Sequence, residues 1–428
     1  MFTYVGVTAT MRPDPANDRR HATRTLWLCG LLHAFTHLYA VALVPLYLAI
    51  QADFKLPSVV QATLLLTVMM VAYFVPSYPM GVLADRMSRK RLLGLGLAIN
   101  ALGFIGMGLA PSYPVALTCA ALAGFGGSFY HPAATALVAQ LFPVNTGRAL
   151  GIAGVGASVG FCLGPMYAGW RAQAAGWRAP LLELGLGGLA AAALFAWLAE
   201  DRPGPVRKAR AEHSRLFPTR ALWGWFLAAA ILFSLRDFAG GSMGSLSSLF
   251  LQRAHGMSMQ TTGMLVSAIF IGSIVSNPLF GHFSDRGRRR WTSLVLVAGA
   301  GLVATFPHVP RGWLAPALIA YGFFFLASYP MVEAALMLSV PDAARGRVFG
   351  AFITIAGLLG NLAHWQAGVW VGRMGPAAAD PARYYDLYAG LAGLIVLSLL
   401  ALPCLHAIRQ REGLDSGDSP PTAGPQVS

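Results

Sequence analysis

GVLADRMSRKR, residues 81–91, is a short basic stretch that separates two long apolar runs. A related stretch, GHFSDRGRRR at residues 281–290, separates two further apolar runs 200 positions later. Both begin with glycine, place Asp-Arg four residues further on, and end in a cluster of basic residues. A motif that recurs at a fixed distance in equivalent surroundings indicates an internal duplication. The sequence therefore predicts two similar halves.

Two further pairs of features support the duplication. His-Pro at 131–132 is followed by Pro143, and Tyr-Pro at 329–330 is followed by Pro341, in both cases eleven residues after the first proline. Gly-Arg then opens the next apolar run of each half, at 147–148 and 346–347. Because several unrelated features recur at nearly one offset, chance similarity is a poor explanation.

The composition predicts a protein that lies in a lipid bilayer. Of 428 residues, 56% are hydrophobic and only 11% are charged, whereas soluble domains contain roughly 25% charged residues. The net charge of +14 does not indicate a nucleic-acid partner, because the basic residues form short clusters between apolar runs. All four cysteines lie inside apolar runs. We expect them to be small buried side chains rather than disulfides or metal ligands.

Twelve apolar runs are long enough for helices that cross a bilayer, which takes about 20 residues. We therefore predict an all-α membrane protein with twelve transmembrane helices in two pseudo-symmetric halves. The predicted spans are 25–50, 59–82, 92–110, 114–142, 148–170, 180–199, 221–251, 261–282, 291–308, 313–340, 348–372 and 385–408. The predicted divisions are a tail at 1–24, a first half at 25–199, a linker at 200–220, a second half at 221–408 and a disordered tail at 409–428.

The distribution of basic residues predicts the orientation. Of the 31 Lys and Arg residues, 23 fall on the side of the membrane that carries both termini, seven fall on the other side, and Arg236 lies within a span. Basic residues accumulate on the cytoplasmic side. We expect a multi-pass protein of the bacterial cytoplasmic (inner) membrane with both termini in the cytoplasm. No cleavable signal peptide is expected, since the first apolar run is too long for one, and Met11 is a plausible alternative start.

The residues of the two basic loops have specific expected roles. Gly81 and Gly281 would let neighbouring helices approach closely. Asp85 and Asp285 would accept hydrogen bonds from a facing helix N-terminus or pair with an arginine. Two readings remain open for the basic residues, which either fix topology alone or also form contacts that break in another conformation. These are Arg86, Arg89, Arg286 and the remaining basic residues of each loop.

The loop pattern, placed between the second and third spans and repeated between the eighth and ninth, resembles the cytoplasmic-loop motif of the major facilitator superfamily. The resemblance extends over about residues 25–408. It implies two six-helix bundles related by a pseudo-two-fold axis along the membrane normal, with a central substrate cavity. It also implies alternating access, with the loop motifs acting as a gate that latches the cytoplasmic side when the transporter faces outward.

A second pattern is similar to the fosmidomycin-resistance-like branch of that superfamily. Residues 124–132 read GFGGSFYHP, with a Gly-Arg pair and a glycine-rich fifth span after them. Ala133 stands where that branch often has an acidic residue. The resemblance implies a relationship to that branch without indicating a particular substrate.

The fifth span carries small residues at four-residue intervals, which would form a flat face for close helix packing. Pro165 is expected to bend this helix. The pattern resembles the superfamily's antiporter motif, which implies export by exchange, although generic helix packing would use the same residues. The predicted helix-packing residues are Gly156, Gly160, Gly164, Pro165 and Gly169.

Charged residues inside spans are costly and are candidates for function. Only Glu183, Arg236, Asp237 and Glu333 qualify among the acidic and basic residues. Glu183 is near the end of its span and can reach the interface. Adjacent residues on a helix point about 100° apart, so we expect Arg236 and Asp237 to face different surroundings, one the cavity and the other a neighbouring helix.

Four histidines lie well inside predicted spans. His33 and His37 are four residues apart and share one face of the first span, and His131 lies at a similar depth in the fourth. His364 lies in the eleventh span beside Trp365. Each could be a hydrogen-bonded packing residue or part of a site. No metal site is predicted, because no carboxylate in the same half would complete the ligand set.

The resemblance implies that the first, fourth, seventh and tenth helices line the cavity. The candidate residues for substrate and proton binding lie on those helices and are His33, His37, His131, Arg236, Asp237 and Glu333. A carboxyl group in a low-dielectric environment takes up a proton more readily than in water, so Asp237 or Glu333 is expected to carry a coupling proton. Aromatic residues of the same helices could line the cavity or only pack, and these are Phe35, Tyr39, Tyr130, Phe233, Phe325 and Tyr329.

The expected function is secondary active transport of a small organic solute, with proton-coupled efflux favoured by the antiporter-like glycines. A symporter or uniporter that takes up a metabolite is the alternative. An enzyme is not expected, because no nucleophile–base pair or metal cluster is apparent, and no Gly-x4-Gly-Lys-Ser/Thr phosphate loop occurs. The expected driving force is a proton gradient without a bound cofactor. The expected partners are the lipid bilayer and the substrate, with no nucleic acid, and a monomer is expected.

Overall fold

The computed structural model describes residues 15–84, 86–201, 217, 219–284, 287–341 and 345–412. Three residues predicted to form the gate, Asp85, Asp285 and Arg286, lie outside the described residues. The same is true of most of the predicted linker and of most of both predicted tails.

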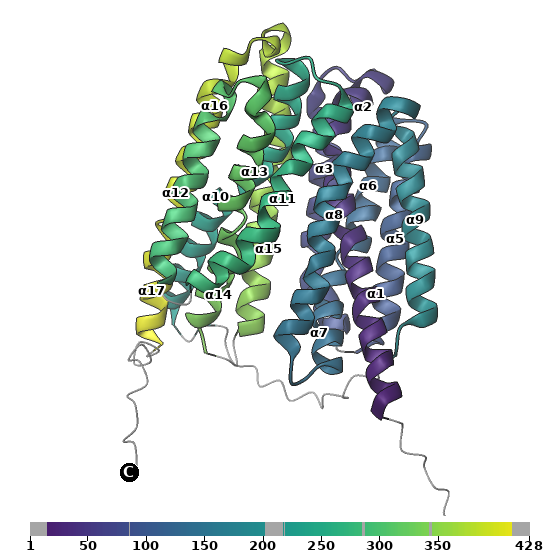
Figure 1. Ribbon diagram of the computed structural model, residues 1–428, viewed down its shortest axis with the longest axis vertical. Helices are drawn as coiled ribbons and strands as arrows, with labels where there is room; N and C mark the ends of the chain where they lie inside the picture. Colours follow the sequence, from purple (N-terminus) through teal and green to yellow (C-terminus); the bar gives the residue numbers. More distant parts are fainter. Residues whose placement is uncertain are drawn as a thin grey trace, which may run out of the picture.

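The described chain is helical throughout and forms two bundles that stand side by side (Figure 1). The first bundle has ten helical elements. They are α1 (Pro15–Ala42), η1 (Val44–Leu46), α2 (Tyr47–Asp53), α3 (Val59–Phe74), α4 (Ser77–Ala84), α5 (Arg89–Leu109), α6 (Tyr113–Gly127), α7 (Tyr130–Leu141), α8 (Thr146–Ala175) and α9 (Arg178–Leu198).

The second bundle begins after the linker. Its elements are α10 (Arg220–Arg253), α11 (Met259–Ser284), α12 (Arg288–Thr305), η2 (Phe306–His308), η3 (Arg311–Trp313), α13 (Leu314–Phe325), α14 (Ser328–Leu338), α15 (Arg345–Met374), η5 (Gly375–Ala379), η6 (Pro381–Tyr384), α16 (Tyr385–Ser398) and α17 (Ala401–Arg411).

Eleven helical stretches of the described chain are long and apolar enough to cross a membrane. The remaining crossing is the fourth, where α6 and α7 follow one another but are each too short to count alone. The predicted all-α architecture with twelve crossings is confirmed. The first helix begins at Pro15, well before the apolar run at residue 25, and its arginines Arg19 and Arg20 are exposed.

The fourth and tenth crossings break at equivalent places. Turn residues 128–129 separate α6 from α7, and turn residues 326–327 separate α13 from α14. In each case a proline, Pro132 or Pro330, is the third residue of the new helix. Proline is tolerated there because the first N–H groups of a helix have no intrahelical acceptor. The repeated Pro of the sequence thus marks a repeated interruption of the helix.

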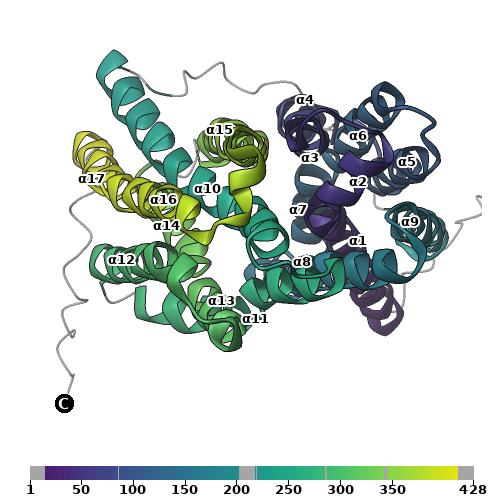
Figure 2. The same cartoon turned by 90° about the horizontal axis from the view of Figure 1, so that it is seen from above.

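The two bundles meet along two helix pairs, α8 with α11 and α3 with α15 (Figure 2). Glycines permit both approaches. A methyl group at Gly169 would collide with the Met259 carbonyl of α11, and one at Gly368 would collide with Thr63 of α3. Between α8 and α11, the rings of Phe161 and Phe270 stack with centroids 4.8 Å apart.

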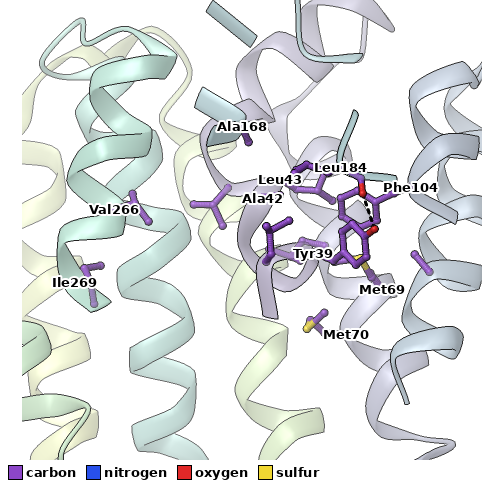
Figure 3. Close-up of a cluster of buried hydrophobic side chains, with 14 of the residues drawn as sticks. Tyr39, Ala42, Leu43, Met69, Met70, Phe104, Ala168, Leu184, Val266 and Ile269 are labelled. Atoms are coloured by element: carbon purple, nitrogen blue, oxygen red, sulfur yellow. Dashed lines mark hydrogen bonds between the residues drawn. The ribbon is translucent and has the colours of Figure 1, made fainter. Parts of the chain in front are cut away.

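The interior of each bundle is packed with apolar side chains. In the first bundle Tyr39 is 1% exposed, its ring lies 4.1 Å from that of Phe104, and its hydroxyl donates to the Leu184 carbonyl at 2.8 Å (Figure 3). That bond satisfies the polar tip of an otherwise apolar ring. Three helices of the first bundle are therefore fixed together at this point.

The bundles are joined at the end of the molecule far from the termini, which we call the distal end. There Ser248 donates to the Val44 carbonyl at 2.7 Å, and Gln252 donates to the Pro45 carbonyl at 3.2 Å. The inter-bundle hydrogen bonds of the described chain lie at this end or near mid-height, whereas the bundles separate toward the end that carries the termini (Figure 1). The bundles are thus hydrogen-bonded to one another at the distal end, and their helices diverge toward the terminal end.

Candidate functional site

Two clusters of polar side chains lie at equivalent positions of the two bundles. The first comes from α1 and α7 and contains His33, His37 and His131, and we call it the histidine cluster. The second comes from α10 and α14 and contains Arg236, Asp237, Tyr329 and Glu333, and we call it the charged cluster. Asp237 stands 200 residues after His37, and Tyr329 stands 198 after His131. The duplication therefore places both clusters at one site of a common architecture.

The histidine cluster brings together residues from two helices. His33 and His37 are one helical turn apart, and their Nε2 atoms are 3.0 Å from one another. The ring centroid of His131 lies 5.2 Å from that of His33 and 5.5 Å from that of His37. His131 is the exposed member, and the other two are partly buried. The structure thus brings together all three histidines that the sequence proposed.

The hydrogen bonds of His33 fix its tautomer. Its Nδ1 lies 3.0 Å from the Ala153 carbonyl of α8. A carbonyl oxygen only accepts, so Nδ1 carries a proton and Nε2 of the neutral ring presents a lone pair to His37. The rings of Tyr130 and Phe161 pack against His33 and His37, with centroids 4.6 Å and 4.3 Å away. The cluster thus consists of hydrogen-bonding imidazole rings that pack against aromatic side chains.

The approach of α8 to α1 depends on the glycines of the fifth span. Methyl groups at Gly156 and Gly160 would collide with the carbonyls of Gly30 and Ala34, and one at Gly164 would lie 2.8 Å from the Leu38 carbonyl. These glycines therefore hold α8 against the helix that carries two histidines. The last glycine of the series, Gly169, faces the other bundle, and α8 continues as one helix through the buried Pro165.

The charged cluster is built around an ion pair between adjacent residues. Both Nε and Nη2 of Arg236 donate to Oδ1 of Asp237, at 2.9 Å and 2.7 Å. The prediction that these residues face different surroundings is wrong. Their Cβ atoms do diverge on the helix, but the long arginine side chain folds back across the helix surface to its neighbour. Arg236 is 2% exposed, so this pair is largely removed from water.

The rest of the arginine contacts α14. Its guanidinium lies 4.2 Å from the ring centroid of Tyr329, and Nη1 donates to the Ser328 carbonyl at 3.4 Å. An aromatic face stabilises a cation that has lost its water. On the other side, Asp237 lies so close to α15 that a methyl group at Gly360 would be 2.7 Å from its Cβ. The ion pair is therefore held between three helices of one bundle.

Glu333 lies one helical turn beyond Tyr329 on α14 and is partly buried. It is within electrostatic reach of Arg236 and Asp237. Within the part of the chain that the structure describes, it makes neither a hydrogen bond nor a salt bridge. The cluster thus contains one carboxylate that is paired directly and one that is not.

Glu183, the fourth charged residue within a span, has local partners. Its carboxylate accepts from Arg171 at 2.7 Å and from Tyr167 at 2.6 Å, and both partners belong to α8. About one third of the Arg171 and Glu183 side chains is exposed. This pair joins α8 to α9 near the distal end, which agrees with the interpretation that Glu183 reaches the interface.

A hydrogen-bonded chain between the bundles was missed by the sequence analysis. Tyr47 donates to Ser245 at 2.8 Å, Ser245 donates to Nδ1 of His364 at 2.8 Å, and His364 donates from Nε2 to Asn361 at 3.1 Å. The amide nitrogen of Asn361 donates in turn to the Gly357 carbonyl, so each donor has one acceptor. His364 could have indicated this chain, because it is a histidine within an apolar run. The serine and the tyrosine gave no such indication.

The described residues of the loop motifs make different contacts in the two halves. Arg89 donates to the Ala136 carbonyl at 3.1 Å and to Gln140 at 2.8 Å, both in α7 of its own bundle. A methyl group at Gly81 would lie 3.7 Å from Pro132, whereas one at Gly281 would meet no described residue within 4 Å. Arg86 is exposed. The described residues thus show no close approach at Gly281, and the predicted latch involves Asp85, Asp285 and Arg286, which lie outside the described residues.

The aromatic residues of these helices divide between packing and the clusters. Tyr39, Phe233 and Phe325 are buried. Tyr130 covers His33, and Tyr329 covers Arg236. Two of these aromatic side chains, Tyr130 and Tyr329, therefore cover the clusters, and the three buried ones pack in the interior.

The geometry supports binding and proton exchange rather than bond chemistry. Ionisable side chains at mid-membrane are retained where they serve a pathway or a ligand. The unpaired Glu333 could exchange a proton and the histidines could accept or donate hydrogen bonds, whereas the charge of Arg236 is taken up by Asp237.

Comparison with known proteins agrees with this architecture. Residues 26–364 match the family model described as Major Facilitator Superfamily. The chain is 27% identical over 348 residues to the multidrug resistance protein MdtG of Citrobacter koseri, covering 77% of this chain and 80% of that one. It is 22% identical over 383 residues to the fosmidomycin resistance protein of Escherichia coli K12, covering 87% and 90%.

The fold is also that of a solved transporter. A bacterial homologue of the human lysosomal transporter Spinster, in an inward-facing and unoccupied conformation, superposes with a TM-score of 0.69 at 18% identity, covering 91% of this chain and 97% of that one. The family match, the twelve crossings and the duplicated halves lead to one conclusion. The chain belongs to the major facilitator superfamily and is a multi-pass membrane transporter, not an enzyme.

Proposed function

We propose that this transporter exports small organic compounds in exchange for protons across a bacterial cytoplasmic membrane. Both termini would lie in the cytoplasm, because the terminal side carries 23 of the 31 basic residues. In that orientation the end at which the bundles diverge would face the cytoplasm. The conformation would be the one that receives a compound from inside the cell.

The charged cluster is the observation that carries the proposal. A proton-coupled carrier needs a carboxyl group that exchanges its proton as the surroundings change. Asp237 is held by two hydrogen bonds from Arg236, whereas Glu333 has no such partner in the described chain. We therefore assign the coupling proton to Glu333 and the task of holding Arg236 to Asp237.

The direction of transport is supported by two observations of different kinds. The relatives in Citrobacter koseri and Escherichia coli carry names that refer to drug resistance, which for a membrane carrier means removal of the drug from the cell. In addition, the fifth-span glycines that resemble an antiporter motif pack α8 against α1 beside the histidine cluster. An exchanger uses one site for both cargoes in turn, and these two clusters would provide that site.

The test uses the purified transporter in vesicles and an efflux-deficient bacterial strain. Fosmidomycin and ethidium serve as probes, with accumulation measured in the presence and absence of an uncoupler. We expect the wild type to lower accumulation only while the proton gradient persists. Glu333→Gln should abolish gradient-driven export but retain exchange of labelled for unlabelled probe.

The outcomes separate the proposal from its alternative. If export remains fully coupled to the proton gradient in both the Glu333→Gln and the Asp237→Asn variant, the assignment of the proton to this cluster is overturned. Accumulation of the probe inside cells that depends on the proton gradient would instead identify a symporter. Accumulation of the probe that is unchanged by the uncoupler would identify a uniporter.

A further inference from the structure

The histidine cluster has the composition of a metal site. One ring nitrogen from each of His33, His37 and His131 lies within 4.8 Å of the other two. In a tetrahedral zinc site, nitrogen ligands stand roughly 3.3 Å apart, given Zn–N bonds of about 2.0–2.1 Å. The pair on α1 is already 3.0 Å apart, so a movement of at most about 1.5 Å by the His131 ring would complete three ligand positions.

We propose that His33, His37 and His131 bind a divalent transition-metal ion such as Zn²⁺ through three imidazole nitrogens. Neutral imidazoles suit Zn²⁺, Cu²⁺ and Ni²⁺, whereas Mg²⁺ and Ca²⁺ require oxygen ligands. The sequence alone predicted no metal, because no carboxylate of that half was available as a fourth ligand. Three histidines with an open fourth position are nevertheless a complete protein ligand set for zinc.

The surroundings of His33 support this role. Metal-binding histidines usually donate their second ring N–H to a carbonyl or carboxylate, which fixes the tautomer and the ring orientation. His33 does so through Nδ1 to the Ala153 carbonyl. Its Nε2 lone pair therefore points toward His37, where the ion would lie. Binding requires that the proton of His37 move from Nε2 to Nδ1, which is a change of tautomer without change of charge.

Space for a fourth ligand and a route of entry are both present. A cavity of about 50 Å³ borders His33 and His131 and continues along α7 past Ala134 and Val138. That volume accommodates at least one water molecule. His131 is exposed, which leaves this side of the cluster accessible to an ion. The fourth position would take water or a donor atom of a transported compound.

The placement of the ligands predicts how a metal would affect transport. All three come from α1 and α7 of one bundle, so a bound ion does not bridge the two bundles. It would move with the first bundle as the transporter changes conformation, and it would not lock the distal closure. This inference concerns binding by the first bundle and does not depend on the direction of transport or on the proton.

The test is metal binding by the full-length protein in detergent, purified without a polyhistidine tag. Zn²⁺ is titrated by calorimetry in competition with a chromophoric chelator, and Co²⁺ is added separately to record its visible spectrum. We expect one ion per chain and the intense absorption of four-coordinate Co²⁺. His37→Gln and His131→Ala should each weaken Zn²⁺ binding by more than about 100-fold, beyond the loss typical of an outer-shell change.

The control is His406→Gln, which alters an exposed histidine of α17 in the other bundle and should leave binding unchanged. Monodispersity in size-exclusion chromatography establishes that each variant is folded, and the exposed position of His131 makes that variant the safest. Absence of binding at micromolar Zn²⁺ would overturn the proposal, as would a six-coordinate Co²⁺ spectrum. Equal affinity in the wild type and both cluster variants would overturn it as well.

Discussion

The centres of the two bundles occupy equivalent positions but differ in chemistry. In the first, three histidines meet around a hydrogen bond of 3.0 Å between two Nε2 atoms. In the second, Arg236 and Asp237 form an ion pair of 2.7 Å beside an unpaired carboxylate. One backbone arrangement thus carries neutral, tautomeric groups on one side and fixed charges on the other.

The difference separates two tasks that a transporter must combine. The charged cluster is held by cation–π contact, by one backbone carbonyl and by its own counter-ion, so its parts depend strongly on one another. The histidine cluster is held by one carbonyl and by ring packing, so it can adapt to a ligand. Duplication followed by divergence at the same positions thus gives one bundle a tightly interdependent cluster and the other a cluster that can adapt.

The largest expected effect comes from breaking the ion pair. Arg236→Leu leaves the Asp237 carboxylate buried without its partner, which typically costs about 3–5 kcal/mol. We expect a corresponding loss in the free energy of unfolding, measured by chemical denaturation in detergent. The double variant Arg236→Leu/Asp237→Leu removes both charges and should recover most of it. If the double variant is as unstable as the single one, the pair is not what stabilises this centre.

A smaller effect is expected from the packing that positions the histidines. Gly160→Ala places a methyl group against the Ala34 carbonyl and should cost about 1–3 kcal/mol, as overpacking does. Gly154→Ala on the same helix is the matched control, because a methyl group there meets no described residue within 4 Å. It should be neutral or stabilising by up to about 1 kcal/mol. Equal losses in both variants would mean that helix propensity, rather than contact with α1, governs this face.

The smallest effect is expected within the histidine cluster. His37→Gln keeps a donor for Nε2 of His33 and changes a neutral hydrogen bond worth about 0.5–1.5 kcal/mol. The free energy of unfolding should fall by less than about 1 kcal/mol, measured as for the other variants. A loss as large as that of Arg236→Leu would contradict the comparison, since it would make the two centres equally interdependent.

The main lines of the fold could be predicted from the sequence, because apolar runs and a repeated motif both act locally. Residues 81–91 and 281–290 predicted the duplication, and the family match agrees with it. The broken fourth crossing was not predicted as a break, although Pro132 marked its place. Hydrophobicity reports whether a segment crosses the membrane and does not report whether its backbone is continuous.

The candidate site was only partly predictable. The shared face of His33 and His37 followed from helical spacing, since residues four apart are neighbours. The contact with His131 required knowledge of which helices meet. Spacing also misled for Arg236 and Asp237, because it describes where Cβ atoms point and not where a flexible guanidinium ends. The serine and tyrosine that bond across the bundles, Ser245 and Tyr47, gave no signal, because a hydroxyl in an apolar run is common.

The distal closure has a consequence for how such a protein can diverge. Its hydrogen bonds from Ser248 and Gln252 end on the main-chain carbonyls of Val44 and Pro45. Mutation can replace those two side chains without removing either acceptor. The hydrogen bonds of the closure therefore constrain the side chains of Ser248 and Gln252, whereas those of Val44 and Pro45 are constrained by their burial instead.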